Sequence, residues 1–109
     1  MNFKIETIHT FDRQIKRMAK KFPSLKKDFI SFLEDLSASP LQGTPLGRDC
    51  YKIRLAITSK NRGKSGGARV ITNVHVVGET IYLLSIYDKS DKSNLGEGEL
   101  DTLLEQIED

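Results

Sequence analysis

The alternation of hydrophobic and polar residues predicts the elements of the first half of the chain. Residues 2–8 alternate with a period of two, which is typical of a short strand. Two later stretches repeat apolar residues every three or four positions, as helices that are buried on one face do. The two stripes comprise Phe11, Ile15, Met18 and Phe22, and then Phe29, Phe32, Leu33 and Leu36. Thr10 and Ser24 are suitable N-terminal caps, so we expect two closely joined helices.

The second half of the chain is predicted to be mostly strand. Runs rich in β-branched and aromatic residues cover residues 50–57, 68–77 and 79–88, and Gly78 marks a hairpin turn. In the first run, apolar residues alternate with Lys52 and Arg54, so both cations should lie on the face away from the helices. A final helical stripe comprises Leu100, Leu103, Leu104 and Ile107. The predicted fold is α+β, in the order β-α-α-β-β-β-α: an antiparallel sheet, a helical hairpin on one face and a C-terminal helix.

The composition is that of a soluble domain. The 109 residues include 38% hydrophobic and 29% charged residues, so we expect one domain over residues 1–109. No apolar run approaches the ~20 residues that span a bilayer, and charges interrupt the N-terminal stretch where a secretory signal would be apolar. The one cysteine, Cys50, cannot form an internal disulfide and is expected to be buried in a strand. We therefore predict a cytoplasmic protein without a membrane association.

The net charge of +2 is distributed unevenly along the chain. Residues 1–70 contain 15 Lys and Arg against 6 Asp and Glu, whereas residues 71–109 contain 2 and 9. A basic block of this kind is typical of a surface that binds polyanions. Charge alone fits a solvated basic face equally well.

The stretch SKNRGKSGGARV, residues 59–70, concentrates cations among glycines. Its GKS sequence resembles a nucleotide-binding loop, but such a loop needs a glycine where Thr58 stands and a helix where a strand is predicted. We interpret it as a basic hairpin loop suited to nucleic acid. Metal-ligating spacing of His and Cys is absent from the sequence, so no metal is expected.

Three segments together resemble the RelE/ParE superfamily of toxins from type II toxin–antitoxin systems. They are CYKIRLA, SKNRGKSGGARVI and IYLLSIYDKSDKSNL, and the likeness is strongest to HigB-type toxins. The resemblance implies a ribosome-dependent endoribonuclease, or mRNA interferase, that cleaves mRNA in the ribosomal A site and inhibits translation. It implies attack of a ribose 2′-hydroxyl on the adjacent phosphate, without a metal or cofactor. The implied partners are the ribosome, mRNA and a cognate antitoxin encoded in the same operon.

The family's basic positions map onto particular residues of this chain. The resemblance implies catalytic roles for Lys52, Arg54, Arg69 and Lys89, with Arg69 the first choice for stabilising the transition state. Contacts to ribosomal RNA would come from Lys60, Arg62 and Lys64. Some members carry a tyrosine as a base after the last strand, but SDKSNL has none. The base is therefore unassigned, and the candidates for acid–base work are Tyr87, His75 and Asp91.

Two other functions stay open at this point. The same fold hosts toxins that poison DNA gyrase, and a fold does not fix a function. A non-catalytic RNA-binding module would also use a basic face. Stacking aromatic residues would favour that third function, yet few aromatic residues lie among the cations of this chain.

Overall fold

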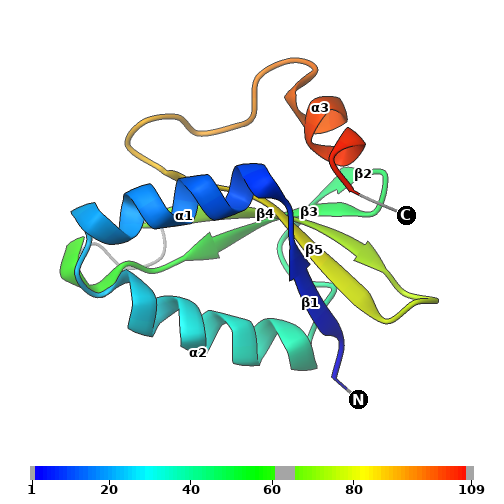
Figure 1. The fold of residues 1–109 in the computed structure, drawn as a ribbon, viewed down its shortest axis with the longest axis horizontal. Helices are drawn as coiled ribbons and strands as arrows, with labels where there is room; N and C mark the ends of the chain where they lie inside the picture. Colours follow the sequence, from blue (N-terminus) through cyan, green and yellow to red (C-terminus); the bar gives the residue numbers. More distant parts are fainter. Residues whose placement is uncertain (1, 61–65, 108–109) are drawn as a thin grey trace.

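A computed structural model of the chain describes residues 2–60 and 66–107. The predicted helices and strands occur in the predicted order, with one additional strand, β2, before the central strands and a C-terminal helix after the last strand (Figure 1). The elements are β1 (Lys4–Thr7), α1 (His9–Lys21), α2 (Leu25–Ala38), β2 (Thr44–Gly47), β3 (Cys50–Leu55), the 3-10 turn η1 (Thr58–Lys60), β4 (Ala68–His75), β5 (Thr80–Asp88) and α3 (Glu99–Glu105).

The strands form a five-stranded sheet in the order β1-β5-β4-β3-β2. The pairs β2–β3, β3–β4 and β4–β5 are antiparallel, as predicted, whereas β1 runs parallel to β5. The edge strand β2 was not predicted, because its four residues are all exposed and show no alternation. It pairs with β3 through a tight turn in which Arg48 and Asp49 have φ of 56° and 61°. Two successive positive φ values suit the twist of a short hairpin.

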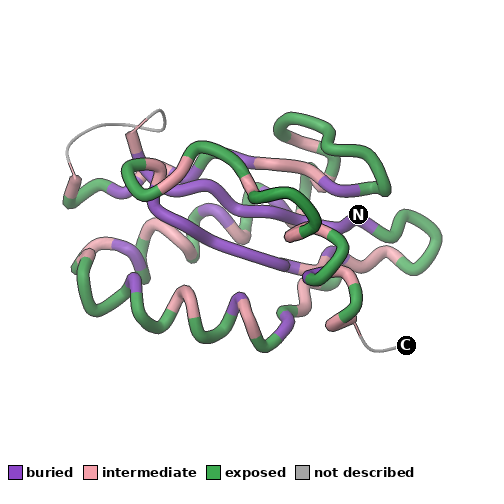
Figure 2. The backbone as a smooth tube through the Cα atoms, turned by 90° about the horizontal axis from the view of Figure 1, so that it is seen from above, coloured by how far each residue is buried: buried purple, intermediate pink, exposed green. Residues whose placement is uncertain are grey.

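The two long helices bury the predicted apolar stripes against the sheet. Phe11 and Met18 of α1 are buried, as are Leu25, Phe32 and Leu36 of α2. Figure 2 shows that the buried segments are concentrated in the central strands, while the helices alternate between buried and exposed residues. This burial removes apolar surface from water and is the main source of stability for the fold.

The alternation of β3 is confirmed. Ile53 and Leu55 are 5% and 4% exposed, whereas Lys52 is half-buried and Arg54 is exposed. Cys50 is buried, also as predicted. The cations of β3 therefore lie on the face that the helices do not cover.

The N-terminus of α1 differs from the prediction. The helix begins at His9 and is capped by Ile8, so Thr10 lies within its first turn. The Thr10 hydroxyl donates a hydrogen bond of 2.9 Å to Oε1 of Gln106, from the end of the chain. A local capping pattern cannot reveal such a partner. Ser24 does occupy the capping position of α2, although its hydroxyl donates to Asp28 Oδ2.

A β-bulge lies in the middle of the β4–β5 pair. Ile71 pairs with Ser85 and Thr72 pairs with Leu83, so Leu84 has no partner in the ladder. The side chain of Gln14 accepts hydrogen bonds from the Ile86 N–H at 2.9 Å and from the Ser85 hydroxyl at 3.1 Å. Bulges bend a strand and re-aim its side chains. Here, α1 holds the bent part of β5 in place.

None of the described helices is long and apolar enough to cross a lipid bilayer.

Candidate active site

Three polar side chains form a row across the three central strands of the sheet, near one end of the β4–β5 pair. Arg54 of β3 pairs with Arg69 of β4, and Arg69 pairs with Tyr87 of β5. Neighbouring strands are about 4.8 Å apart, so the row spans roughly 10 Å. Like charges directly opposite one another destabilise a sheet. An anion bound beside the two guanidinium groups would therefore stabilise this part of the sheet.

Lys52 extends this cationic row along β3. It lies two residues before Arg54, on the same face and roughly 7 Å away along the strand. Its Nζ donates a 2.6 Å hydrogen bond to Oδ1 of Asn94. The chain after β5 thus returns over the face that carries Lys52.

The same returning segment covers Tyr87. The Tyr87 hydroxyl donates to the carbonyl of Ser93 at 3.4 Å, and the Lys92 ammonium lies 4.8 Å from the centre of the ring. Lys92 also forms an ion pair with Glu99 at the start of α3. Farther on, Asp101 of α3 pairs with Arg48 in the β2–β3 turn. Ionic contacts therefore tie residues 92–101 to the sheet.

Burial affects the proton affinity of the two central residues. Arg69 is 4% exposed and Tyr87 is 6% exposed. Burial, together with the nearby Arg54, lowers the pKa of Arg69, while Tyr87 opposes that shift. Burial raises the pKa of Tyr87, against the opposing effect of Arg69. At neutral pH Arg69 is a cation and Tyr87 is a neutral phenol, which can donate a proton.

Lys60 is held by a carboxylate next to this row. Its Nζ lies 2.6 Å from Oδ1 of Asp88, the last residue of β5, and its side chain is only 11% exposed. Asp88 also accepts hydrogen bonds from the backbone and hydroxyl of Ser90. Burial alone would raise the pKa of Asp88, but the bonds from Lys60 and Ser90 outweigh burial and lower it. Lys60 is thus engaged with the protein rather than projecting into solvent.

Lys89 and Asp91 follow β5 directly. Lys89 is half-buried, and its backbone N–H donates to the carbonyl of Gly67 at 3.0 Å. Asp91 is exposed and lines a cavity of about 200 Å³, together with Arg17, Tyr87 and Asp88. Of the acid–base candidates, Tyr87 and Asp91 thus share one cavity.

His75 lies at the opposite end of β4. It is six residues beyond Arg69, which corresponds to roughly 20 Å along a strand. Its ring contacts the Asn73 side chain at 2.5 Å and packs edge-on against Tyr82. The fold therefore does not bring His75 together with Arg69. Across residues 2–60 and 66–107, no group of three or more His, Cys, Asp or Glu is arranged to hold a metal ion.

The basic loop is described only at its two ends. Arg62 and Lys64 fall outside the described residues. Before the loop, Asp28 accepts hydrogen bonds from both the backbone and the hydroxyl of Thr58, which fixes η1 to α2. After it, the chain enters β4 at Ala68. A nucleotide-binding loop needs a helix at this point, so the observed strand does not fit such a loop.

Comparison with known sequences identifies the family of this chain. The profile of the RelE toxin of RelE/RelB toxin–antitoxin systems matches residues 8–107. The chain belongs to the RelE toxin family. The resemblance to the RelE/ParE superfamily is thereby confirmed, and the match extends from the end of β1 past α3. No curated protein matches the sequence.

Solved structures show the same RelE fold at low sequence identity. An arginine-substituted mutant of the E. coli toxin RelE in the free state has a TM-score of 0.56 and 18% identity, covering 97% of this chain and 94% of that one. The same mutant in complex with an antitoxin RelB peptide has a TM-score of 0.57 and 19% identity, covering 94% and 95%. The toxin–antitoxin complex RelBE2 of Mycobacterium tuberculosis gives 0.60 and 17%, covering 81% and 92%.

Several residues of the site were not found from the sequence of this RelE family member. Asn94, Lys92 and Glu99 lie in a stretch without periodicity, and only the fold brings them to β3 and β5. Asp88 stands at the end of a strand, where the sequence indicates only an ordinary turn residue. Its ion-pair partner Lys60 lies 28 residues earlier in the chain, so no local signal indicated the pair.

Proposed function

We propose that this RelE family protein is the toxin of a type II toxin–antitoxin system and acts as a ribosome-dependent endoribonuclease. The observation that carries the proposal is the row Arg54–Arg69–Tyr87, with Lys52 beside it. Two arginines and a lysine provide the charge-assisted hydrogen bonds that hold a phosphodiester. A buried neutral phenol next to them provides a proton donor. The HigB-type subclass stays a prediction of the sequence.

In the proposed reaction, the 2′-oxygen of one ribose forms a bond to the adjacent phosphorus, and the bond to the 5′-oxygen of the next nucleotide breaks. The products are a 2′,3′-cyclic phosphate and a 5′-hydroxyl. Arg69, with Arg54, stabilises the extra negative charge on the phosphoryl oxygens in the transition state. Lys52 binds the phosphate or the neighbouring backbone, and Lys89 is a second phosphate ligand.

Two proton transfers complete this reaction. The 5′-oxygen takes a proton as it leaves, and we assign Tyr87 as its donor, because a raised pKa keeps the phenol protonated at neutral pH. The 2′-hydroxyl loses its proton to a base. Asp91 shares the cavity with Tyr87, which supports Asp91 over His75 in this role.

The proposal includes three partners: the ribosome, mRNA and a cognate antitoxin. Family membership supports the antitoxin, since RelE toxins belong to RelE/RelB systems. Two of the similar structures contain antitoxin components. The ribosome and mRNA are supported by the cationic face, because phosphate contacts dominate the affinity for nucleic acids.

The experiment is to add the purified protein to a translation extract and map the 5′ ends of the mRNA. The proposal predicts new ends inside codons, only when ribosomes are present and translating. In parallel, DNA supercoiling by purified gyrase is measured with the same protein. Gyrase inhibition without mRNA cleavage would support the ParE-like alternative and contradict the proposal. RNA binding without either effect would support the non-catalytic binding module.

A further inference from the structure

The outer side of α1 carries a row of cations that the candidate site does not use. Arg13 lies three and four residues before Lys16 and Arg17, and Lys20 lies four and three residues after them, so the four line one helical face. We call this set the α1 basic stripe. All four residues are exposed. The row is about 10 Å long, at 1.5 Å of rise per residue.

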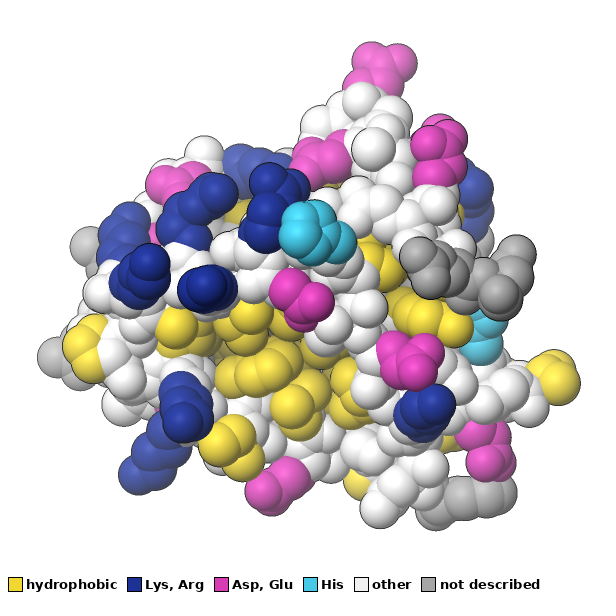
Figure 3. Space-filling view, viewed as in Figure 1, with side chains coloured by type: hydrophobic (Ala, Val, Ile, Leu, Met, Phe, Trp, Pro, Cys, Tyr) yellow, Lys and Arg dark blue, Asp and Glu magenta, His cyan; other side chains and the backbone are white. Residues whose placement is uncertain are grey.

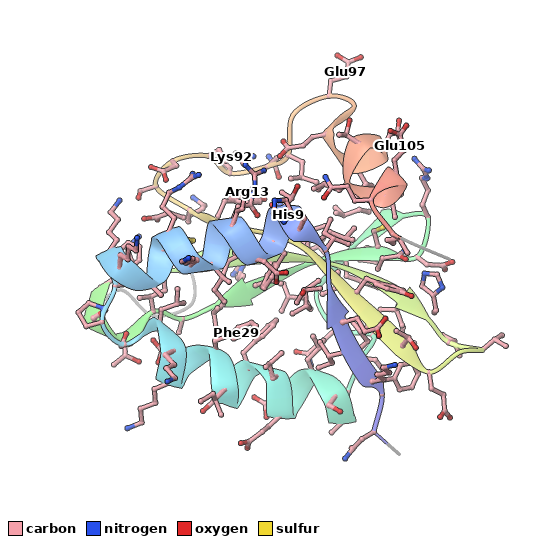
Figure 4. The ribbon with its side chains drawn as sticks, viewed as in Figure 1. His9, Arg13, Phe29, Lys92, Glu97 and Glu105 are labelled. Atoms are coloured by element: carbon pink, nitrogen blue, oxygen red, sulfur yellow. The ribbon has the colours of Figure 1, made fainter. Side chains whose placement is uncertain are left out.

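The stripe forms a visible patch on the molecular surface. Figure 3 shows Lys and Arg side chains gathered over α1, to one side of the apolar surface between the two long helices. Figure 4 shows Arg13 and His9 on the same side of α1, turned away from Phe29 of α2. The apolar stripe of α1, with Phe11 and Met18, is buried on the other side.

The charges of the stripe are not neutralised within the described part of the chain. The salt bridges there involve Lys4, Lys21, Arg48, Lys60 and Lys92, and none involves a stripe residue. Like charges three or four positions apart cost a helix about 0.2–0.5 kcal/mol per pair. A polyanion bound along this face would remove that cost.

The chemistry of the stripe fits a nucleic acid better than a protein. The centre of a protein–protein interface is rich in aromatic residues and poor in lysine, whereas surfaces that bind nucleic acid are polar and strongly positive. The large exposed apolar residues of the described chain lie elsewhere, at Ile30, Leu41, Leu46, Val76 and Val77. The stripe also contains no aromatic residue on which unpaired bases could stack.

We propose that the α1 basic stripe is a docking surface for the phosphate backbone of double-stranded RNA. This inference deepens the proposed function, on which it rests for the choice of RNA over DNA. Duplex RNA is recognised largely through its shape and its phosphates, and a straight row of exposed cations provides that contact. Arg17 connects the two sites, because it lines the cavity that Tyr87 and Asp91 share. A duplex held by α1 would thus lie beside that cavity.

The test compares two double variants with the same change of charge. Lys16→Gln/Lys20→Gln removes two cations of the stripe, and Lys26→Gln/Lys27→Gln removes two exposed cations from the first turn of α2. Neither pair belongs to the candidate catalytic row. The probe is a labelled RNA hairpin of arbitrary sequence, and its dissociation constant is measured over a range of salt concentrations. Circular dichroism establishes that both variants remain folded.

We expect the stripe variant to bind the hairpin roughly tenfold more weakly at physiological salt. Its plot of log affinity against log salt should be shallower by about 1.5, since each lost phosphate contact removes about 0.7–0.9 from the slope. The α2 variant should change the affinity about twofold. An equal loss in both variants would overturn the proposal, because net charge would then explain the binding. An unchanged slope in the stripe variant would overturn it as well.

A final comparison separates this inference from the proposed function. Hairpin binding requires neither a ribosome nor cleavage, so it is measured independently of the proposed reaction. If the stripe variant binds normally while mRNA is still cut, only the docking surface is disproved. If the variant instead loses binding to polyglutamate and keeps RNA binding, the stripe serves an acidic protein and the proposal is wrong.

Discussion

The two ends of the β4–β5 pair differ in burial, although β4 provides a basic side chain at each end. At one end Arg69, Tyr87 and Asp88 are buried, and Ser93 of the segment after β5 accepts a hydrogen bond from Tyr87. At the other end His75 is exposed, and the hairpin tip presents Val76 and Val77 to solvent. Arg69 and His75 are an even number of residues apart in β4, so they share a face of that strand.

Two residues on the same face of a strand therefore need not belong to the same site. Both ends contain a tyrosine of β5 beside a basic residue of β4, Tyr87 with Arg69 and Tyr82 with His75. Only the first end adds neighbouring cations, Arg54 and Lys52, from β3. The proposed chemistry therefore depends on three strands meeting, and matched substitutions at the two ends test it.

The largest effect is expected at the two basic residues of β4. Arg69→Ala should lower the cleavage rate by on the order of 100- to 1000-fold, the usual loss when a transition-state charge partner is removed. His75→Ala should change the rate less than about twofold. Single-turnover cleavage of mRNA on programmed ribosomes measures both. If both variants are folded and lose cleavage activity to a similar degree, the two ends of the β4–β5 pair contribute equally to cleavage.

The next effect is expected at the two tyrosines of β5. Tyr87→Phe should lower the rate about 100-fold, a typical contribution of a general acid, while Tyr82→Phe should leave it nearly unchanged. Because the pKa of Tyr87 is raised, the wild-type rate should not fall through ionisation of this phenol until the pH exceeds about 10. A wild-type level of cleavage by Tyr87→Phe would exclude Tyr87 as the acid.

A smaller effect, on stability, is expected for two aspartates. Asp88→Asn leaves the mostly buried Lys60 ammonium without its anion and should lower the free energy of unfolding by about 2 kcal/mol, less than for a fully buried pair. Asp49→Asn, at the other end of the sheet, should change it by less than about 0.5 kcal/mol. Urea unfolding at neutral pH measures both variants. Equal free energies for the two would mean that the Lys60–Asp88 pair does not stabilise the fold.

The difference in stability between the wild type and Asp88→Asn should also depend on pH. The pKa of Asp88 is lower in the folded protein than in the unfolded chain, where an aspartate has a pKa of about 3.9. The carboxylate thus stabilises the fold above that pH, and this stabilisation is lost as the pH falls through the lower, folded value. The stability difference between the wild type and Asp88→Asn should shrink below about pH 4. A constant difference down to pH 2 would contradict the assignment.

Residues within one strand were predictable from the sequence, whereas contacts between distant segments were not. Alternation in residues 50–57 placed Lys52 and Arg54 on one face, because a strand has a fixed period of two. No such periodicity marks β2, whose four residues are all exposed. Nor does a local pattern give the parallel direction of β1, or the contact of Asn94 with Lys52, which spans 42 residues. These features depend on how the packed elements meet.

The most direct measurement of the central claim is cleavage of an mRNA that lacks one hydroxyl group. The cut is first mapped on a ribosome-bound message, and the 2′-hydroxyl of the nucleotide on the 5′ side of that cut is then replaced by hydrogen. If the protein directs a ribose 2′-oxygen onto the adjacent phosphate, the substituted message should remain intact at that position while the unmodified one is cleaved. Cleavage of the substituted message at the same bond and rate would contradict the claim.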